Sequence, residues 1–180
     1  MKLGKIEVVD NFLEEENFEI IKQILGVSIP WEFSQVLTVD GETNTTLMCD
    51  EIDNYQFVHM VYTDDRIISD FYNILEGSNL FKKMNVRSLC RIKFNSISKT
   101  EKIITHGYHQ DIFLPPPERE NGVKTSILYM NTNDGFTVFE NGTKIKSKAN
   151  RLVTFPATFR HSGTTCTNCP RRVGLNIVYF

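Results

Sequence analysis

The chain has 180 residues, of which 41% are hydrophobic and 11% aromatic. This length and composition suffice for one core, so we expect a single domain over residues 1–180. The 20 Lys and Arg residues are balanced by 22 Asp and Glu residues. This balance argues against a nucleic-acid partner, because such partners are bound by an excess of positive charge. No stretch reaches the ~20 apolar residues of a membrane span, and no apolar leader opens the chain. We therefore expect a soluble, cytoplasmic protein with no membrane partner.

The first part of the chain, residues 1–85, is predicted to contain helices. Residues 6–9 predict a short strand. A helix follows, because Phe18, Ile21 and Leu25 recur at helical spacing.

A second helix is predicted further along. Residues 27–50 favour a hairpin, and residues 56–62 predict a strand. The apolar spacing from Ile67 to Leu75 then predicts a helix closed by Gly77. These two helices would cover one face of the sheet.

From Val86 the pattern becomes mostly β. Over residues 90–95 apolar side chains alternate with the polar Arg91, Lys93 and Asn95. Alternation does not say whether the polar face lines a barrel or meets solvent, so both interpretations stay open. Lys93 and Asn95 are accordingly left outside the predicted site.

The later strands predict the fold class. After a Pro-rich loop at residues 113–122, interpreted as a connection beside the site, strands are expected at residues 124–130, 136–139, 144–146, 151–155 and 173–180. Many strands and few helices predict a mainly β fold with flanking helices. It would be a double-stranded β-helix, a cupin-like jelly-roll barrel over residues 86–180, with the N-terminal helices packed on its major sheet.

The candidate metal ligands are two histidines and one carboxylate. In an extended segment His109 and Asp111 share a face, and His161 is the histidine that remains downstream. Such a set leaves coordination positions open on a non-haem Fe(II) ion. Of the other histidines, His59 is expected to have a core or surface role. His106 should lie on the opposite strand face from His109, as a supporting or surface residue.

Strand parity separates the two arginines that open the last strand. One face is large and apolar and consists of Val173, Leu175, Ile177 and Tyr179. The other is smaller and partly polar, and Arg172 shares it with Gly174 and Asn176. Arg172 is therefore predicted to enter the pocket, with Arg171 as the alternative.

The order of these parts resembles the Fe(II)/2-oxoglutarate-dependent dioxygenase superfamily, and its prolyl-4-hydroxylase-like branch in particular. The resemblance is clear from about residue 91 onward and loose before it. It rests, in order, on His109-x-Asp111, on Tyr129 at the end of a strand, on residues 135–139, on His161 and on a basic residue that opens the last strand.

The resemblance implies a mechanism and its cofactors. His109, Asp111 and His161 would be the Fe(II) ligands and catalytic residues, and Arg172 and Tyr129 would bind 2-oxoglutarate. The reaction would use O₂, hydroxylate a C–H bond and release succinate and CO₂, and it leaves ascorbate open as a further cofactor. The substrate would be a peptide or protein, for instance at a prolyl residue, or a small molecule. A core role for Tyr129 remains an alternative.

Two other functions stay open. One is a catalytically inactive metal-binding jelly-roll module, against which the complete triad and Arg172 argue. The other is a nucleic-acid demethylase of the same superfamily, which the balanced charge disfavours.

The Cys166-x-x-Cys169 pair supplies only half of a zinc site, since Cys49 and Cys90 are isolated. We predict two free, dispensable loop thiols near the metal.

Overall fold

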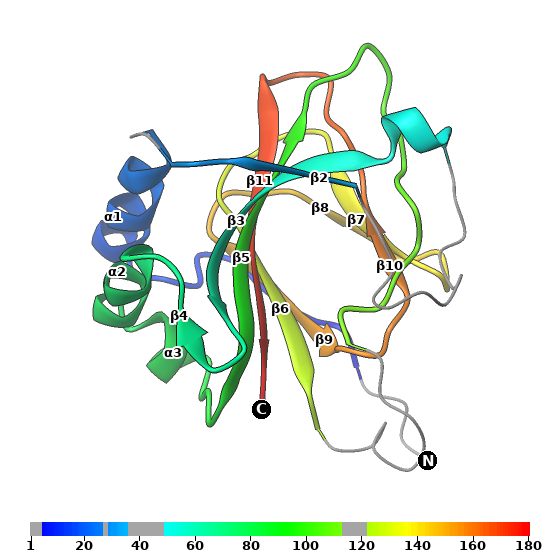
Figure 1. Ribbon diagram of the computed structural model, residues 1–180. Coiled ribbons are helices and arrows are strands. Elements are labelled where there is room, and N and C mark those ends of the chain that lie inside the picture. Colours follow the sequence, from blue (N-terminus) through cyan, green and yellow to red (C-terminus); the bar gives the residue numbers. More distant parts are fainter. Residues whose placement is uncertain (1–4, 27–28, 36–48, 113–121) are drawn as a thin grey trace.

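The computed structural model of the chain describes residues 5–26, 29–35, 49–112 and 122–180. Within these residues two antiparallel sheets face each other and enclose a barrel (Figure 1). The larger sheet has the order β1-β9-β6-β11-β5-β3-β2, with β4 paired to β3, and the smaller has the order β10-β7-β8. The strands are β1 (Glu7–Val9), β2 (Glu32–Gln35), β3 (Tyr55–Thr63), β4 (Arg66–Ile67), β5 (Leu89–Ser98), β6 (Lys124–Tyr129), β7 (Phe136–Phe139), β8 (Lys144–Lys146), β9 (Arg151–Pro156), β10 (His161–Gly163) and β11 (Arg171–Tyr179).

Three helices cover the outer face of the larger sheet (Figure 1). They are α1 (Glu15–Gly26), α2 (Phe71–Gly77) and α3 (Leu80–Lys83), and a short 3-10 helix, η1 (Glu51–Asp53), precedes β3. The main core lies between helices and sheet, where Ile21 and Leu75 join Ile92 and Leu175. A second cluster lies between the two sheets and consists of Tyr129, Phe139, Val153 and Phe155. The predicted fold class, a mainly β barrel with helices on its major sheet, is confirmed. None of the described helices is long and apolar enough to cross a membrane.

The paired central strands β5 and β11 form part of the inner wall of the barrel. Ile92 and Phe94 of β5 pack into the core under the helices, so the alternate residues Arg91, Lys93 and Asn95 face the interior. This resolves the open interpretation of β5 in favour of a polar face that lines the barrel. The direction of the face follows from packing, because burying the apolar face against the helices leaves the polar one inside.

The region after β3 corrects one predicted element. Residues Ile67 and Ile68 were expected in a helix, but Ile67 lies in β4, which pairs with β3. The turn between these strands contains Asp64 and Asp65 at φ 51° and 56°, the left-handed conformation that short hairpin turns require. Helix α2 therefore begins only at Phe71, and the separate helix α3 was not predicted.

Other expectations fall in connecting segments. The segment that leads into the His-x-Asp motif forms isolated bridges, Thr105 with Thr164 and His109 with His161. The strands and the turn of the hairpin predicted within residues 27–50 lie outside the described residues. Ahead of them, the described strand β2 pairs with β3. Most of the Pro-rich loop at residues 113–122 also lies outside them.

Candidate metal centre

His109, Asp111 and His161 come together inside the barrel. Their candidate ligand atoms all lie within 4.8 Å of one another, and Nε2 of His161 is 3.5 Å from Oδ2 of Asp111. His109 and His161 form a backbone bridge in which each amide donates to the other's carbonyl at 3.0 Å. The start of β10 and the irregular segment between β5 and β6 that contains His109 therefore hold the two imidazoles side by side. Two nitrogen ligands and one oxygen ligand on one side match a facial triad.

Backbone carbonyls orient both imidazoles. Nδ1 of His109 lies 3.3 Å from the carbonyl of Gly107, and Nδ1 of His161 lies 3.0 Å from the carbonyl of Phe159. A ring that donates through Nδ1 keeps Nε2 free of a proton, which is the form a metal binds. Burial, with His161 beside it, lowers the pKa of His109 to about 3, so its ring is neutral over the physiological range.

Three donors hold the carboxylate of Asp111. Nη2 of Arg91 donates to Oδ1 at 2.6 Å, while Thr125 and Asn176 donate to Oδ2 at 2.9 Å and 3.2 Å. Burial raises the pKa of this carboxyl, but His161, Arg91 and the other nearby groups outweigh burial and bring it well below its ordinary value. Asp111 is thus a charged and oriented ligand before any metal arrives.

Arg172 crosses the barrel from β11 to the smaller sheet. Its Nε donates to Oγ of Ser147 at 2.7 Å and its Nη2 to Oγ1 of Thr137 at 3.0 Å. The guanidinium lies 5.3 Å from the ring centre of Tyr129. Although Arg172 is only 7% exposed, no carboxylate of the described residues pairs with it. A buried cation held only by neutral groups is suited to bind an anion.

The neighbouring arginine points the other way, as the parity argument predicted. Nη2 of Arg171 donates to the carbonyl of Leu25 at 3.1 Å, and its guanidinium lies 5.6 Å from the ring centre of Trp31. Arg171 therefore connects β11 to α1 by a hydrogen bond, whereas the side chain of Arg172 lies inside the barrel.

Tyr129 is fully buried beneath Arg172. Its hydroxyl donates to Oγ1 of Thr137 at 2.7 Å, the same oxygen that accepts from Arg172. Burial raises the pKa of this phenol, so the hydroxyl keeps its proton. The ring of Tyr129 is thus a core residue with its hydroxyl close to Arg172, and its contact with 2-oxoglutarate stays a prediction.

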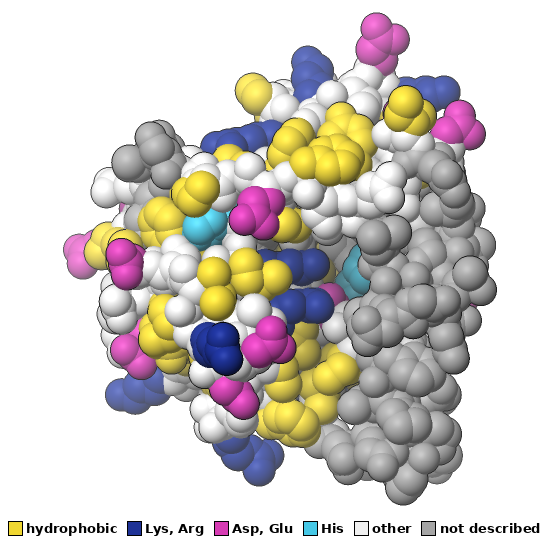
Figure 2. All heavy atoms as spheres, in the orientation of Figure 1, with side chains coloured by type: hydrophobic (Ala, Val, Ile, Leu, Met, Phe, Trp, Pro, Cys, Tyr) yellow, Lys and Arg dark blue, Asp and Glu magenta, His cyan; other side chains and the backbone are white. Residues whose placement is uncertain are grey.

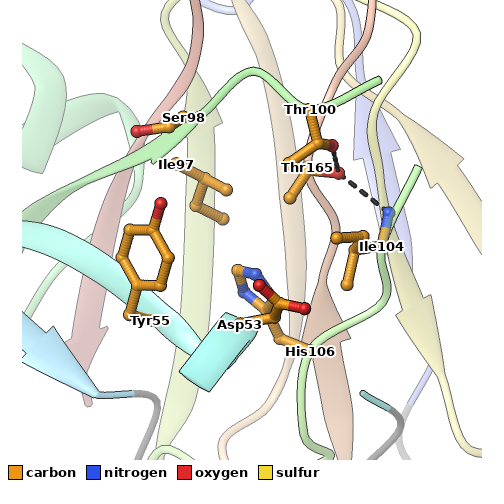
Figure 3. Close-up of a pocket in the computed structure, with 8 residues that line it drawn as sticks. All are labelled: Asp53, Tyr55, Ile97, Ser98, Thr100, Ile104, His106 and Thr165. Atoms are coloured by element: carbon orange, nitrogen blue, oxygen red, sulfur yellow. Dashed lines mark hydrogen bonds between the residues drawn. The ribbon is translucent and has the colours of Figure 1, made fainter. Parts of the chain in front are cut away.

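A small cavity opens at the Arg172 end of the barrel (Figure 3). Its wall includes Ile97, which pairs with Arg172 in the sheet, and His106, whose ring faces the cavity (Figure 3). Asp53 also lines the cavity. The rest of the wall consists of Tyr55, Ser98, Thr100, Ile104 and Thr165. His106 is 1% exposed, and burial, with Arg172 nearby, lowers its pKa to about 4. His106 is therefore not a surface residue, and the supporting role expected for it stays a prediction.

The mouth of the barrel is lined by charge. Figure 2 shows a hollow in which basic side chains lie beside an acidic side chain and a histidine. On the inner face of β5, Lys93 lies opposite Asn176 of β11. Burial, with Arg91 beside it, lowers the pKa of Lys93 to about 8.

The remaining motifs have structural explanations. His59 is buried, with Nδ1 2.9 Å from the carbonyl of Pro30 and Nε2 2.9 Å from Oγ of Ser69, as expected for a core histidine. The sulfurs of Cys166 and Cys169 lie 3.6 Å apart as free thiols. Among the described residues the one cluster able to hold a metal is the His-Asp-His set.

Sequence reasoning missed the donors around Asp111. Arg91, Thr125 and Asn176 come from three different strands, so their convergence depends on the sheet register. The alternation within β5 and β11 did mark Arg91 and Asn176 as members of a polar face. Thr137 and Ser147, the side chains that accept hydrogen bonds from Arg172, had no comparable pattern in the sequence.

Comparison with known proteins addresses the fold. No protein-family model and no curated protein sequence matches the chain. A prolyl hydroxylase from Trichoplax adhaerens, solved in complex with a hypoxia inducible factor peptide fragment, aligns over 97% of this chain and 83% of its own, with TM-score 0.58 and 15% identity. An oxidoreductase of the 2OG-Fe(II) oxygenase family from Burkholderia pseudomallei aligns over 97% of this chain and 84% of its own, with TM-score 0.65 and 12% identity.

A prolyl-4-hydroxylase from Pseudomonas putida aligns over 99% of this chain and 92% of its own, with TM-score 0.56 and 12% identity. The chain has the fold of the 2OG-Fe(II) oxygenases. The jelly-roll predicted from the sequence is therefore confirmed, and in this fold the alignments extend over the N-terminal helices as well as the barrel.

Proposed function

We propose that the protein is an Fe(II)- and 2-oxoglutarate-dependent dioxygenase that hydroxylates a C–H bond of its substrate. The observation that carries this proposal is Arg172, a buried cation without a carboxylate partner among the described residues, inside the same barrel as a two-histidine, one-carboxylate set. A purely structural metal site does not need such a cation.

The residues fit an Fe(II) ion. Nε2 of His109, Nε2 of His161 and one oxygen of Asp111 would hold it, because each Nδ1 already has a carbonyl partner. Three protein ligands on one side would leave the other positions for the co-substrate and O₂. Thr125 and Asn176 would keep the carboxylate in place as the metal binds.

The residues also fit 2-oxoglutarate. The planar guanidinium of Arg172 can bind the distal carboxylate through two parallel hydrogen bonds, with the hydroxyl of Tyr129 beside it. Two glycines leave space for this arrangement: a Cβ at Gly163 would lie 3.2 Å from Nη1 of Arg172, and a Cβ at Gly135 would lie 2.8 Å from its Cδ. The cavity walled by Ile97 and His106 lies at this same end.

The reaction balances with these partners. One atom of O₂ enters the substrate as a hydroxyl group, and the other enters 2-oxoglutarate as that molecule loses CO₂ and becomes succinate. The iron supplies the oxidative chemistry when bound. The chain would orient the co-substrate through Arg172. It keeps His109 neutral and Asp111 ionised, and the apolar cluster around Phe139 and Phe155 would exclude water.

A direct assay tests the proposal. The protein is incubated with Fe(II), 2-oxoglutarate and O₂, with and without ascorbate, and with a panel of prolyl peptides, amino acids and small metabolites. Succinate formation and a 16 Da mass increase are the expected products. Prolyl peptides are in the panel because solved prolyl hydroxylases share the fold.

A pair of variants distinguishes an enzyme from an inactive metal-binding module. Arg172→Ala should keep its metal but lose 2-oxoglutarate affinity by roughly tens to thousands of fold, the effect of about 2–5 kcal/mol for a buried charge-assisted contact. Arg171→Ala should bind 2-oxoglutarate like wild type, because Arg171 contacts α1. Equal affinities in all three proteins would favour the module.

A further inference from the structure

The inward faces of β5 and β11 carry more positive charge than the metal site and 2-oxoglutarate require. The inward faces of β5 and β11, both described along their whole length, hold the cations Arg91, Lys93 and Arg172 and no carboxylate. Asp111 offsets one of them. An Fe(II) ion and a doubly negative 2-oxoglutarate would cancel each other and leave this excess unchanged.

Two donors in this wall have no acceptor among the described residues. Nε of Arg91 is buried without a hydrogen-bond partner among the described residues, although Nη2 of the same side chain is bound to Asp111. Lys93, two residues along the same strand face, has no ion pair or hydrogen bond to a described side chain. A buried N–H donor and a half-buried ammonium without acceptors are both unfavourable until an acceptor arrives.

The register separates these donors from Arg172. On β11, Arg172 lies opposite Ile97, whereas Lys93 lies opposite Asn176. Ile97 is the fourth residue after Lys93 on β5, which is roughly 13 Å along a strand. Since Asn176 and Arg91 both donate to Asp111, the two free donors lie at the metal end of the barrel. A 2-oxoglutarate held by Arg172 would approach the metal from the other end.

We propose that the substrate carries a carboxylate, which binds between the ammonium of Lys93 and Nε of Arg91 and so places the neighbouring C–H bond at the metal. This inference rests on the proposed function and names its substrate class. Figure 2 shows a hollow with basic side chains in it, and Arg91 keeps 22% of its side chain exposed.

The test uses the chain loaded with Zn(II), which does not react with O₂, and saturated with 2-oxoglutarate. Acetate and the neutral acetamide are titrated into ¹⁵N-labelled protein while the Nε resonance of Arg91 is followed by NMR. Acetate should shift this resonance and acetamide should not. An Arg91 resonance that ignores acetate, or that responds equally to both probes, overturns the proposal.

Two lysine variants locate the anion. Lys93→Met should weaken acetate binding at least about tenfold, while Lys124→Met, at an exposed lysine on β6, should bind acetate like wild type. Acetate bound only through the metal would survive Lys93→Met, and that result contradicts the proposal. So does a loss of 2-oxoglutarate affinity in Lys93→Met as large as in Arg172→Ala, because Lys93 would then belong to the co-substrate site.

The source of the carboxylate is resolved in a second panel. L-proline and L-prolinamide represent a free amino acid, and a short prolyl peptide with a free or an amidated C-terminus represents a peptide. Preference for the acid in the first pair supports a small-molecule substrate, and preference in the second pair alone supports a peptide carboxylate. Failure of wild type to bind 2-oxoglutarate would reject the proposed function, whereas the acetate titration with Zn(II) alone would still decide the anion site.

Discussion

Nη2 of Arg91 lies 2.6 Å from Oδ1 of Asp111, so a cation on β5 holds the carboxylate of the candidate metal centre. Without a metal this arginine balances the charge of a side chain that is 1% exposed. Arg91 and a divalent ion would thus both neutralise the charge of the same carboxylate. The stability of the protein and its response to metal are consequently coupled through this pair.

We predict that Arg91→Met destabilises the metal-free protein by roughly 2–4 kcal/mol, because it leaves a buried carboxylate without its cation. Zn(II) should then restore more stability to the variant than it adds to wild type, since the metal replaces the lost charge. Thermal unfolding with and without Zn(II) measures both effects. Arg66→Met, at an exposed arginine on β4, is the control. A smaller metal response in Arg91→Met than in wild type would contradict this coupling.

The metal ligands themselves give a second prediction. His109→Ala and Asp111→Asn should each nearly abolish binding of a divalent metal, because a site built from three ligands loses one of them. Anaerobic calorimetry with Fe(II) measures the affinity, and circular dichroism should still show cooperative unfolding. His59→Ala should behave in the opposite way, with normal metal binding and a lower melting temperature, since His59 bonds Pro30 and Ser69. Undiminished iron affinity in the first two variants would remove the triad.

A glycine beside Arg172 provides a third prediction. A Cβ at Gly135 would meet the carbonyl oxygen of Thr165 at 2.7 Å and Cδ of Arg172 at 2.8 Å, distances that force a shift. Gly135→Ala should therefore displace Arg172 and weaken 2-oxoglutarate binding at least about tenfold, with metal affinity retained. Gly77→Ala, where a Cβ meets nothing within 4 Å, is the control. Calorimetric titration of 2-oxoglutarate compares the two, and equal affinity would mean that Arg172 is not the anchor.

The sequence allowed the barrel and its metal ligands to be predicted because their signals are local. His109 and Asp111 are two residues apart, and the side chains around Arg171 and Arg172 differ enough in size to separate two faces. The polar face of β5 could not be oriented in this way, since alternation defines the two faces and leaves their direction open. Only the packing of Ile92 and Phe94 under the helices placed it inside.

Other features depend on contacts distant in the chain. The Arg91 to Asp111 pair spans 20 residues and the Asn176 to Asp111 pair spans 65, so neither has a sequence pattern. The short hairpin through Asp64 and Asp65 replaced the first turn of a predicted helix, because two left-handed residues ended β3 where apolar spacing suggested continuity. The helical spacing of the apolar residues was therefore overridden by the pairing of β3 with β4, which the tight turn allows.

The cysteine pair gives a fourth prediction. Cys169→Ser should change neither the metal content nor the melting temperature, because the described residues around the pair supply no further metal ligand. Cys166→Ser should also keep its metal but should unfold at a lower temperature, since the sulfur is fully buried and serine is more polar. This burial corrects the expectation that both thiols are dispensable, because Cys166 is part of the core. Burial raises the pKa of the Cys166 thiol to about 12, so this group stays protonated. Elemental analysis that finds stoichiometric zinc, lost in either variant, would contradict this interpretation.

The last prediction concerns the cost of Lys93 without its ligand. Burial, together with Arg91, lowers the pKa of Lys93 to about 8, below the value of about 10.4 expected in the unfolded chain. Between these two values the unfolded state binds more protons, so the free energy of unfolding rises with pH there, and the penalty is fully present below pH 8. Lys93→Met should therefore stabilise the metal-free protein at pH 7 by roughly 1–3 kcal/mol.

The advantage of Lys93→Met over wild type should shrink as the pH rises from about 8 to about 10, because wild-type Lys93 then loses its charge in the folded state. Urea unfolding at pH 7, 8, 9 and 10 measures it, and the Lys124→Met protein, altered at an exposed lysine, should stay close to wild type throughout. Acetate should narrow the difference at pH 7 as well, since an anion beside the ammonium stabilises wild type alone. A variant that is less stable than wild type at pH 7, or whose advantage does not change with pH, would show that Lys93 is already paired in the folded protein.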